Sequence, residues 1–224
     1  MMNYVAVIGT GIMAAGIAAG FIAQSIPVVI LGRSKEKADA CLDKALLLAN
    51  KIGLVGSNTQ KDASTLKAEQ STGILEDWSD WGQCLWVIET IAENLALKQQ
   101  VFQYLDGVVP PQIPIGSNSS GFPISKIAEG LKTADRMMGA HYFMPAEVVP
   151  LVEIVMGQKT ALPFAQKAYE LYKSISKKPV LVKKDIPGFL ANRIQHALMR
   201  EALTLVQEGI ATPDDIDDAV RYSF

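Results

Sequence analysis

The sequence predicts an α/β fold: a doubly wound, mostly parallel sheet covered by helices on both faces, followed by the start of an all-helical C-terminal domain. Two observations support this fold class. Short apolar runs rich in β-branched residues alternate with helical patterns, and that alternation stops at Pro187-Gly188. We therefore predict one domain over residues 1–185 and the beginning of a second over residues 186–224.

The first half of the predicted sheet begins near the N-terminus. Apolar runs at 4–9 and 28–31 predict strands that are buried on both faces. A helix is expected over 12–25, and 35–52 has the pattern of an amphipathic helix. The apolar face of that second helix consists of Ala38, Leu42, Ala45, Leu46 and Ala49. Residues 54–72 show no such pattern, so we expect a loop with helix fragments there.

The second half continues the alternation. Further apolar runs have the length and composition of strands, and they span 84–90, 114–120, 137–143, 151–157 and 178–184. The helical stretches between them span 94–108, 124–131 and 163–176.

The C-terminal segment is helical in pattern from Pro187-Gly188 to about Glu208. Thr212 and Pro213 then form a helix-start signature, with threonine as the N-cap and proline at the first helical position. Fewer than about 40 residues are too few for an independent core, so we expect this domain to be truncated.

Composition argues against several classes of function. The net charge of −2 leaves no excess of basic residues for binding phosphates, so we expect no nucleic-acid partner. No apolar run reaches the roughly 18 residues of a membrane span, and the N-terminus shows no targeting segment, so we expect a cytoplasmic location and no membrane partner. Cys41 and Cys84 lack metal-site spacing, which predicts reduced core thiols and no metal.

A glycine motif follows the first predicted strand. In "VIGTGIMAAG", Gly9 permits a tight turn, Gly11 lets the backbone approach a diphosphate, and Ala14 keeps the next helix close to the strand. The start of that helix offers N–H groups and a partial positive charge to phosphates. The motif and its place in a β-α-β unit predict a Rossmann-type dinucleotide-binding domain.

The end of the second strand bears on cofactor choice. A carboxylate that binds the adenine ribose is expected there, but the chain has Gly32, Arg33 and Ser34. Glycine makes room, and an arginine followed by a hydroxyl suits a 2′-phosphate. We therefore predict NAD(P) as the cofactor, with NADP(H) favoured over NAD(H). The alternative is that Arg33 is a solvated surface residue of an NAD enzyme.

His141 is one of only two histidines, and Glu153 follows it twelve residues later. Alone, a histidine in an apolar stretch is more often a packed residue than a proton carrier. The two would form a pair only if a turn through Pro145 and Pro150 brought the strand of Glu153 back beside His141. A carboxylate on one ring nitrogen would then leave the other suited to general acid–base chemistry.

Five motifs, taken in order, resemble the 3-hydroxyacyl-CoA dehydrogenase family, which includes relatives that act on free 3-hydroxy acids such as carnitine and gulonate. The motifs are "GTGIMAAGIA", "VIETIAENLALKQQVFQYLD", "SNSSGFPISKIA", "GAHYFMPAEVVPLVEIV" and "IPGFLANRI…EALTLVQEGIATPDDID". The resemblance covers essentially the whole chain. It implies an oxidoreductase that transfers a hydride between L-3-hydroxyacyl-CoA and NAD(P), and a homodimer if the C-terminal domain is complete.

The resemblance also implies roles for individual residues. His141 would be the general base and Glu153 its carboxylate partner, Ser120 would bond the substrate oxygen, and Asn192 would reach the site from the first C-terminal helix. The cofactor-side positions that it implies are Gly9, Gly11, Ile12, Met13, Ala14, Glu89, Asn94 and Lys98. The last three could equally be solvated helix residues. His196 matches no motif and is interpreted as structural.

Departures from the family pattern keep the substrate open. Met144 stands where an asparagine is usual, and Gly121 replaces a common serine. The bases available for CoA phosphates at the end of the second helix and after it are few: Lys51, Lys61 and Lys67. A free 3-hydroxy or 3-keto acid is therefore the alternative substrate, and a non-catalytic dinucleotide-binding protein is a third hypothesis.

Overall fold

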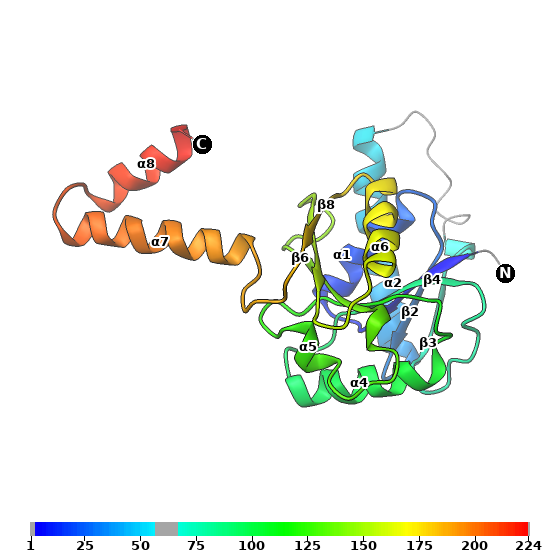
Figure 1. The fold of residues 1–224 in the computed structure, drawn as a ribbon. Coiled ribbons are helices and arrows are strands. Elements are labelled where there is room, and N and C mark those ends of the chain that lie inside the picture. Colours follow the sequence, from blue (N-terminus) through cyan, green and yellow to red (C-terminus); the bar gives the residue numbers. More distant parts are fainter. Residues whose placement is uncertain (1–2, 57–66, 224) are drawn as a thin grey trace. The chain divides into compact units, whose positions relative to one another are not determined.

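The computed structural model describes residues 3–56 and 67–223 (Figure 1). The chain divides into two compact units, residues 1–187 and 188–224, and each is described by itself. Among the described residues, no helix has the length and apolar character needed to cross a membrane.

The first unit contains one eight-stranded sheet in the order β3-β2-β1-β4-β5-β6-β7-β8. The strands are β1 (Tyr4–Ile8), β2 (Val28–Gly32), β3 (Ser71–Ile74), β4 (Cys84–Glu89), β5 (Ile115–Ser117), β6 (Met137–Tyr142), β7 (Leu151–Met156) and β8 (Lys178–Val182). Neighbouring strands are parallel except for β6 and β7, which are antiparallel. This order confirms the predicted Rossmann-type, mostly parallel sheet.

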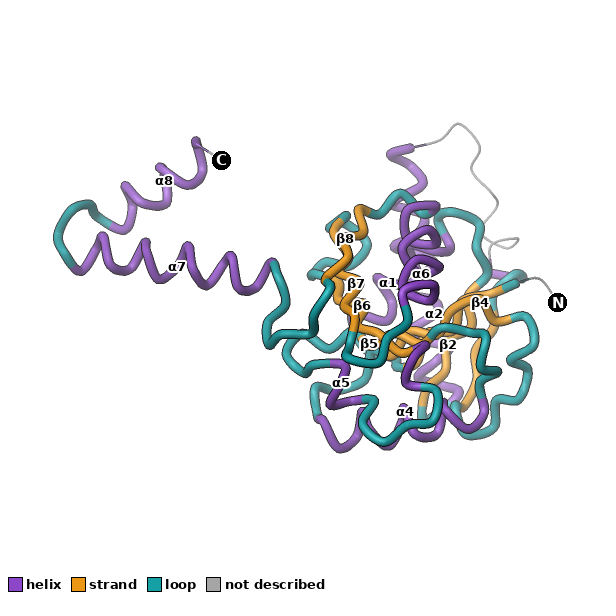
Figure 2. The backbone as a smooth tube through the Cα atoms, viewed as in Figure 1, coloured by secondary structure: helices purple, strands orange, loops and turns teal. Residues whose placement is uncertain are grey.

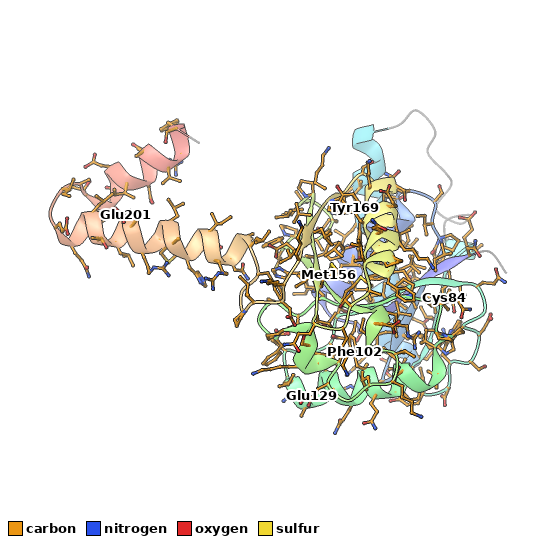
Figure 3. All side chains as sticks on the ribbon, viewed as in Figure 1. Cys84, Phe102, Glu129, Met156, Tyr169 and Glu201 are labelled. Atoms are coloured by element: carbon orange, nitrogen blue, oxygen red, sulfur yellow. The ribbon has the colours of Figure 1, made fainter. Side chains whose placement is uncertain are left out.

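Helices cover both faces of the sheet, as Figures 1 and 2 show. In the first unit they are α1 (Ile12–Ile22), α2 (Lys35–Gly56), α4 (Leu95–Val108), α5 (Ile124–Ile127), the 3₁₀ turn η1 (Ala134–Arg136) and α6 (Leu162–Ser174). Residues of α1, α2 and α6 pack into one core cluster, and residues of α4 and α5 into another. Phe102 of α4 and Cys84 of β4, labelled in Figure 3, belong to the second cluster.

The strand β1 shows why the sheet is buried on both faces. Val5 and Val7 pack into the cluster of α1, whereas Tyr4, Ala6 and Ile8 pack into the cluster of α4. Alternate side chains point to opposite faces of a strand, so a continuous apolar run supplies both clusters.

Some predicted boundaries were wrong. The short strand β3 pairs in parallel with β2 at the sheet edge, and its first two residues fall at the end of the stretch 54–72, where a loop was expected. Residues 57–66 of that stretch lie outside the described residues. The helix α2 continues to Gly56. The helix α5 ends at Ile127 instead of residue 131, and Gly130 adopts a φ of +76°, which is incompatible with a continuing helix.

The second unit consists of α7 (Ala191–Gln207) and α8 (Pro213–Ser223), joined through Gly209 at a φ of +68°. Thr212 caps α8 as predicted: its hydroxyl accepts the Asp215 N–H at 3.2 Å, and the Asp215 carboxylate accepts the Thr212 N–H at 3.2 Å. The α7 side chains, Glu201 among them (Figure 3), include no buried residue. Its exposed apolar residues are Ile194, Leu198, Met199 and Leu203.

Candidate active site

The candidate site lies where β1, β4, β5 and β6 end. These four strands run in parallel, so the segments that follow them meet at one edge of the sheet. They are residues 9–11, 90–94, 118–121 and 143–150.

The glycine motif forms the turn from β1 into α1. Gly9 has a φ of +124°, and a Cβ there would lie 2.6 Å from Thr90 Oγ1, so only glycine fits. Gly11 is the N-cap of α1 without a side-chain cap, and a Cβ there would meet nothing within 4 Å. The first intrahelical bond is from the Ala15 N–H to Gly11 O, so the N–H groups of Ile12, Met13 and Ala14 have no carbonyl partner within the helix. This open, N–H-lined helix start fits a dinucleotide diphosphate.

The end of β2 differs from the prediction in one respect. A Cβ on Gly32 would lie 2.6 Å from Thr10 Cγ2, so a methyl group already fills the room that glycine was expected to leave. Arg33 is exposed, and the Ser34 hydroxyl accepts the Lys37 N–H at 3.4 Å. Lys35 pairs with Asp39 at 2.7 Å, so its charge is partly neutralised.

His141 and Glu153 lie directly opposite each other in the antiparallel pair β6–β7. His141 Nδ1 is 2.7 Å from Glu153 Oε2, and the two residues are 3% and 0% exposed. The hairpin loop 143–150 joins the two strands and contains a cis peptide bond between Met144 and Pro145. The predicted turn thus does bring the two side chains together, in a buried contact where a charge-assisted hydrogen bond is strong.

A cavity of about 290 Å³ adjoins this pair. Its walls come from α1, from the segments that follow β4 and β5, and from β6 with its following loop. The lining residues are Met13, Thr90, Ile91, Glu93, Asn118, Ser120, His141, Tyr142 and Met144. Ser120, His141 and Met13 were predicted site residues. Two larger cavities, of about 420 and 400 Å³, have none of these residues in their walls.

Glu89 and Lys98 form a buried ion pair behind the cavity. They are 0% and 1% exposed, and Lys98 Nζ lies 2.8 and 3.1 Å from the two Glu89 oxygens. The Ser117 hydroxyl and the Ile91 N–H also donate to Glu89, each at 2.6 Å. Burial raises the pKa of Glu89, and the charge of Lys98 with these donors opposes that shift. The alternative that Glu89 and Lys98 are solvated is therefore wrong.

Comparison with known proteins decides the family. A sequence model described as the 3-hydroxyacyl-CoA dehydrogenase NAD binding domain matches residues 4–186, and one for the C-terminal domain of the same proteins matches residues 188–224. The chain belongs to the 3-hydroxyacyl-CoA dehydrogenase family. This confirms the predicted resemblance and makes the chain an NAD-dependent type of dehydrogenase that acts on a hydroxyl group.

Several relatives of this dehydrogenase family cover nearly the whole chain. A 5-formyl-3-hydroxy-2-methylpyridine 4-carboxylate 5-dehydrogenase from Mesorhizobium japonicum is 32% identical over 99% of this chain and 71% of its own length. An L-carnitine dehydrogenase from Oceanobacillus iheyensis is 34% identical over 99% of this chain and 70% of its own length. The solved (S)-3-hydroxybutyryl-CoA dehydrogenase of Ralstonia eutropha has a TM-score of 0.87 and 29% identity, covering 99% of this chain and 77% of that one.

Glu93 is a residue of the candidate site that sequence reasoning missed. Its Oε1 accepts the Ser119 hydroxyl at 2.6 Å and the N–H groups of Ser120 and Gly121, each at 3.1 Å. Its Oε2 is 3.4 Å from Lys98 Nζ. Burial acts against ionisation, but the Ser119 hydrogen bond and the charge of Lys98 hold the pKa of Glu93 below its usual range. Its place in the short segment between β4 and α4 was the available signal.

Three asparagines bear on the structure of the site or on its prediction. Asn94 caps α4, because its Oδ1 accepts the Leu97 N–H at 3.0 Å. Asn118, which was not predicted, lines the cavity and accepts the Tyr142 N–H at 2.8 Å, tying the end of β5 to β6. Asn192 lies on α7 in the second unit, so its place in the site stays a prediction.

Proposed function

We propose that this chain transfers a hydride reversibly between an L-3-hydroxyacyl-CoA and a nicotinamide dinucleotide, with 3-ketoacyl-CoA as the oxidised product. The observation that carries the proposal is the buried contact between His141 and Glu153, placed beside a cavity that also contains Ser120 and the start of the dinucleotide helix.

His141 is proposed as the general acid–base. Glu153 accepts a hydrogen bond from Nδ1–H, which leaves Nε2 as the basic ring nitrogen and stabilises the imidazolium after proton uptake. During oxidation Nε2 takes the proton of the substrate hydroxyl, and during reduction the imidazolium returns it to the carbonyl oxygen.

Ser120 is proposed to orient the reacting oxygen. Its hydroxyl can donate to the substrate oxygen on which charge develops, and Glu93 holds its backbone N–H in place. We further propose that Asn192 adds a second neutral donor from α7. The buried pair Glu89–Lys98 would act indirectly, because Lys98 lies within reach of Glu93 and supports the loop that carries Ser120.

The glycine motif is proposed to hold the cofactor. A bound nicotinamide dinucleotide supplies the hydride acceptor or donor. The N–H groups of Ile12, Met13 and Ala14 would bond its diphosphate, with Gly9 and Gly11 keeping the approach open. This binding mode needs no cationic side chain beside the diphosphate, because the start of α1 carries a partial positive charge.

We also propose that NADP(H) is favoured over NAD(H). Gly32 supplies no carboxylate for the ribose hydroxyls, and the exposed Arg33 makes no ion pair with any residue that the structure describes. A guanidinium beside the Ser34 hydroxyl is suited to a 2′-phosphate. The matched family domain is described by NAD binding, so NAD(H) is the competing outcome.

The cavity favours an uncharged acyl thioester over a free acid. Its nine lining residues include one carboxylate, that of Glu93, and no lysine or arginine. A substrate carboxylate about 6 Å from Glu93 would be repelled by at most about 3 kcal/mol at an effective dielectric constant of about 20, and Lys98 offsets part of that.

The free hydroxy acid is nevertheless the second candidate, because relatives such as the Oceanobacillus iheyensis enzyme bear the name L-carnitine dehydrogenase. Met144 is 62% exposed at the cavity, and a Cβ on Gly121 would meet only Glu93 Oε1, at 3.8 Å. Of the bases considered for CoA, Lys67 pairs with Asp43 at 2.9 Å, and Lys61 lies outside the described residues.

The test is turnover of acetoacetyl-CoA and of free 3-keto acids, each with NADPH and NADH in parallel, followed by the absorbance of the reduced nicotinamide. Faster turnover of the thioester is expected, with NADPH preferred. Turnover of the free acid alone would favour the second candidate. Dinucleotide binding without turnover of any substrate would favour a non-catalytic protein. The homodimer stays a prediction that light scattering would test, and the cytoplasmic location one that cell fractionation would test.

A further inference from the structure

The loop 143–150 connects the two halves of the proposed proton-transfer pair. It follows the strand of His141 and precedes the strand of Glu153, and it carries Met144 of the cavity wall. Inside the loop, the N–H groups of Val148 and Val149 bond to Pro145 O at 3.1 and 2.9 Å. The position of this loop therefore affects both the pair and the cavity.

The loop rests on a glycine surface of α1. Gly16 and Gly20 are four residues apart, so they lie on the same side of the helix. A Cβ on Gly16 would come within 2.5 Å of Glu147 Oε2 and 3.1 Å of Ala146 Cβ. On Gly20 it would lie 3.8 Å from Lys177 Cε. Loop 143–150 and the side chain of Lys177 thus lie against α1, the helix that begins at the glycine motif.

Lys177 joins the loop to this surface. It lies between α6 and β8, is 7% exposed, and donates from Nζ to Ala146 O at 2.5 Å and to Val149 O at 2.8 Å. The ring of Tyr142, next to His141, is 5.7 Å from Nζ. Burial lowers the pKa of Lys177, and the charge of Glu147 opposes that shift. A buried ammonium is costly unless it is bonded, and here its two acceptors are the inward-facing carbonyls of the loop.

We propose that Lys177 is a positioning residue for the dehydrogenase reaction, because it holds loop 143–150 on the glycine surface of α1. His141 and Met13 of α1 line the same cavity. The position of this loop on α1 therefore sets the distance between His141 and the start of α1. This inference rests on the proposed function. A displacement of reacting groups by about 1 Å can lower the rate about 100-fold, so a shift of this loop should lower kcat.

The experiment compares Lys177→Met with Lys178→Met, the exposed neighbouring lysine, as matched control. Three kinds of measurement are made: steady-state kinetics (kcat and KM) with acetoacetyl-CoA, titration for the NADPH Kd, and amide exchange at Val148 and Val149. In Lys177→Met we expect kcat to fall about 30-fold. We expect the NADPH Kd to change less than about threefold, because the start of α1 is untouched. Exchange at the two amides should accelerate. Lys178→Met should match the wild type in all three.

Gly16→Ala perturbs the loop at its contact with α1 and leaves Lys177 intact. We expect faster exchange at the same two amides and a smaller loss of kcat, about fivefold, because the added methyl shifts the loop only slightly. If Lys177→Met does not fold, this variant decides. Wild-type kcat and exchange in either folded variant would overturn the proposal, even if the melting temperature falls. A wild type without turnover would refute the proposed function instead, and the exchange rates would still decide whether Lys177 holds the loop.

Discussion

The cofactor side and the proton-transfer side of the cavity depend on different chemical groups. The turn from β1 into α1 presents backbone N–H groups and depends on missing side chains at Gly9 and Gly11. The side formed by β6 and β7 depends on two side chains, His141 and Glu153, held in one buried contact. Adding atoms should therefore damage the first side, and removing a functional group should damage the second.

The largest expected effect is on the proton-transfer side. His141→Gln keeps a side chain that can bond Glu153 but cannot take up a proton, so kcat should fall about 1,000-fold or more. The Kd for the dinucleotide should stay within about threefold of the wild type, since the start of α1 is unchanged. Steady-state kinetics and fluorescence titration measure both quantities.

His196→Gln is the matched control, because the second histidine is exposed on α7. It should retain wild-type kcat. A His141→Gln variant that keeps more than about one tenth of the wild-type kcat would remove His141 from its proposed role.

On the cofactor side, Gly9 and Gly11 should respond differently to alanine. A Cβ at Gly11 meets nothing in the protein, so Gly11→Ala should keep its melting temperature while dinucleotide Kd rises about tenfold or more through lost charge-assisted hydrogen bonds. Gly9→Ala forces alanine to a φ of +124° against Thr90, so it should lose about 1–3 kcal/mol of unfolding free energy. Calorimetry with cofactor titration distinguishes them. Equal stability of the two variants would contradict this account.

The two sides also differ in how far they could be predicted. The glycine motif is local, because its turn, helix start and strand lie within eleven consecutive residues of the chain. The contact of His141 with Glu153 was predicted from the family resemblance, with a turn through Pro145 and Pro150 as the geometry that would bring the two strands together. Even there, the paired register depends on an antiparallel alignment that the residues alone do not specify.

Contacts between distant segments were the main source of error. Nothing in the sequence distinguishes Lys98 as buried, because its partner Glu89 lies on a different element. Glu93 was missed because its three donors stand 26 to 28 residues away. The Thr10 methyl that fills the space at Gly32 is likewise a contact between two strand ends. The short edge strand β3 has one strongly apolar residue, Ile74, and so lacked a strand signal.

A smaller effect is expected at the outer part of the cofactor side. Arg33→Ala should lower kcat/KM for NADPH about tenfold, the loss of one charge-assisted interaction with the 2′-phosphate, and leave kcat/KM for NADH unchanged. Lys35→Ala is the comparison, because Lys35 is already paired with Asp39 and should matter less. Equal losses with both cofactors would show that Arg33 does not read the 2′-phosphate.

The smallest effect concerns pH. It is expected at Glu93, which lines the cavity from the segment after β4 and whose pKa is lowered in the folded state. A carboxyl group with a lowered folded pKa stabilises the protein above its unfolded pKa, and the contribution disappears as pH falls through the folded value. Glu93→Gln should therefore lower the melting temperature slightly at neutral pH, and the difference from wild type should shrink below pH 4.5, the ordinary value for glutamate. The side chain is 41% exposed, so the shift should be small. The exposed Glu129→Gln should show no such pH dependence, and a Glu93→Gln difference that is constant with pH would mean that lost packing, and not charge, causes it.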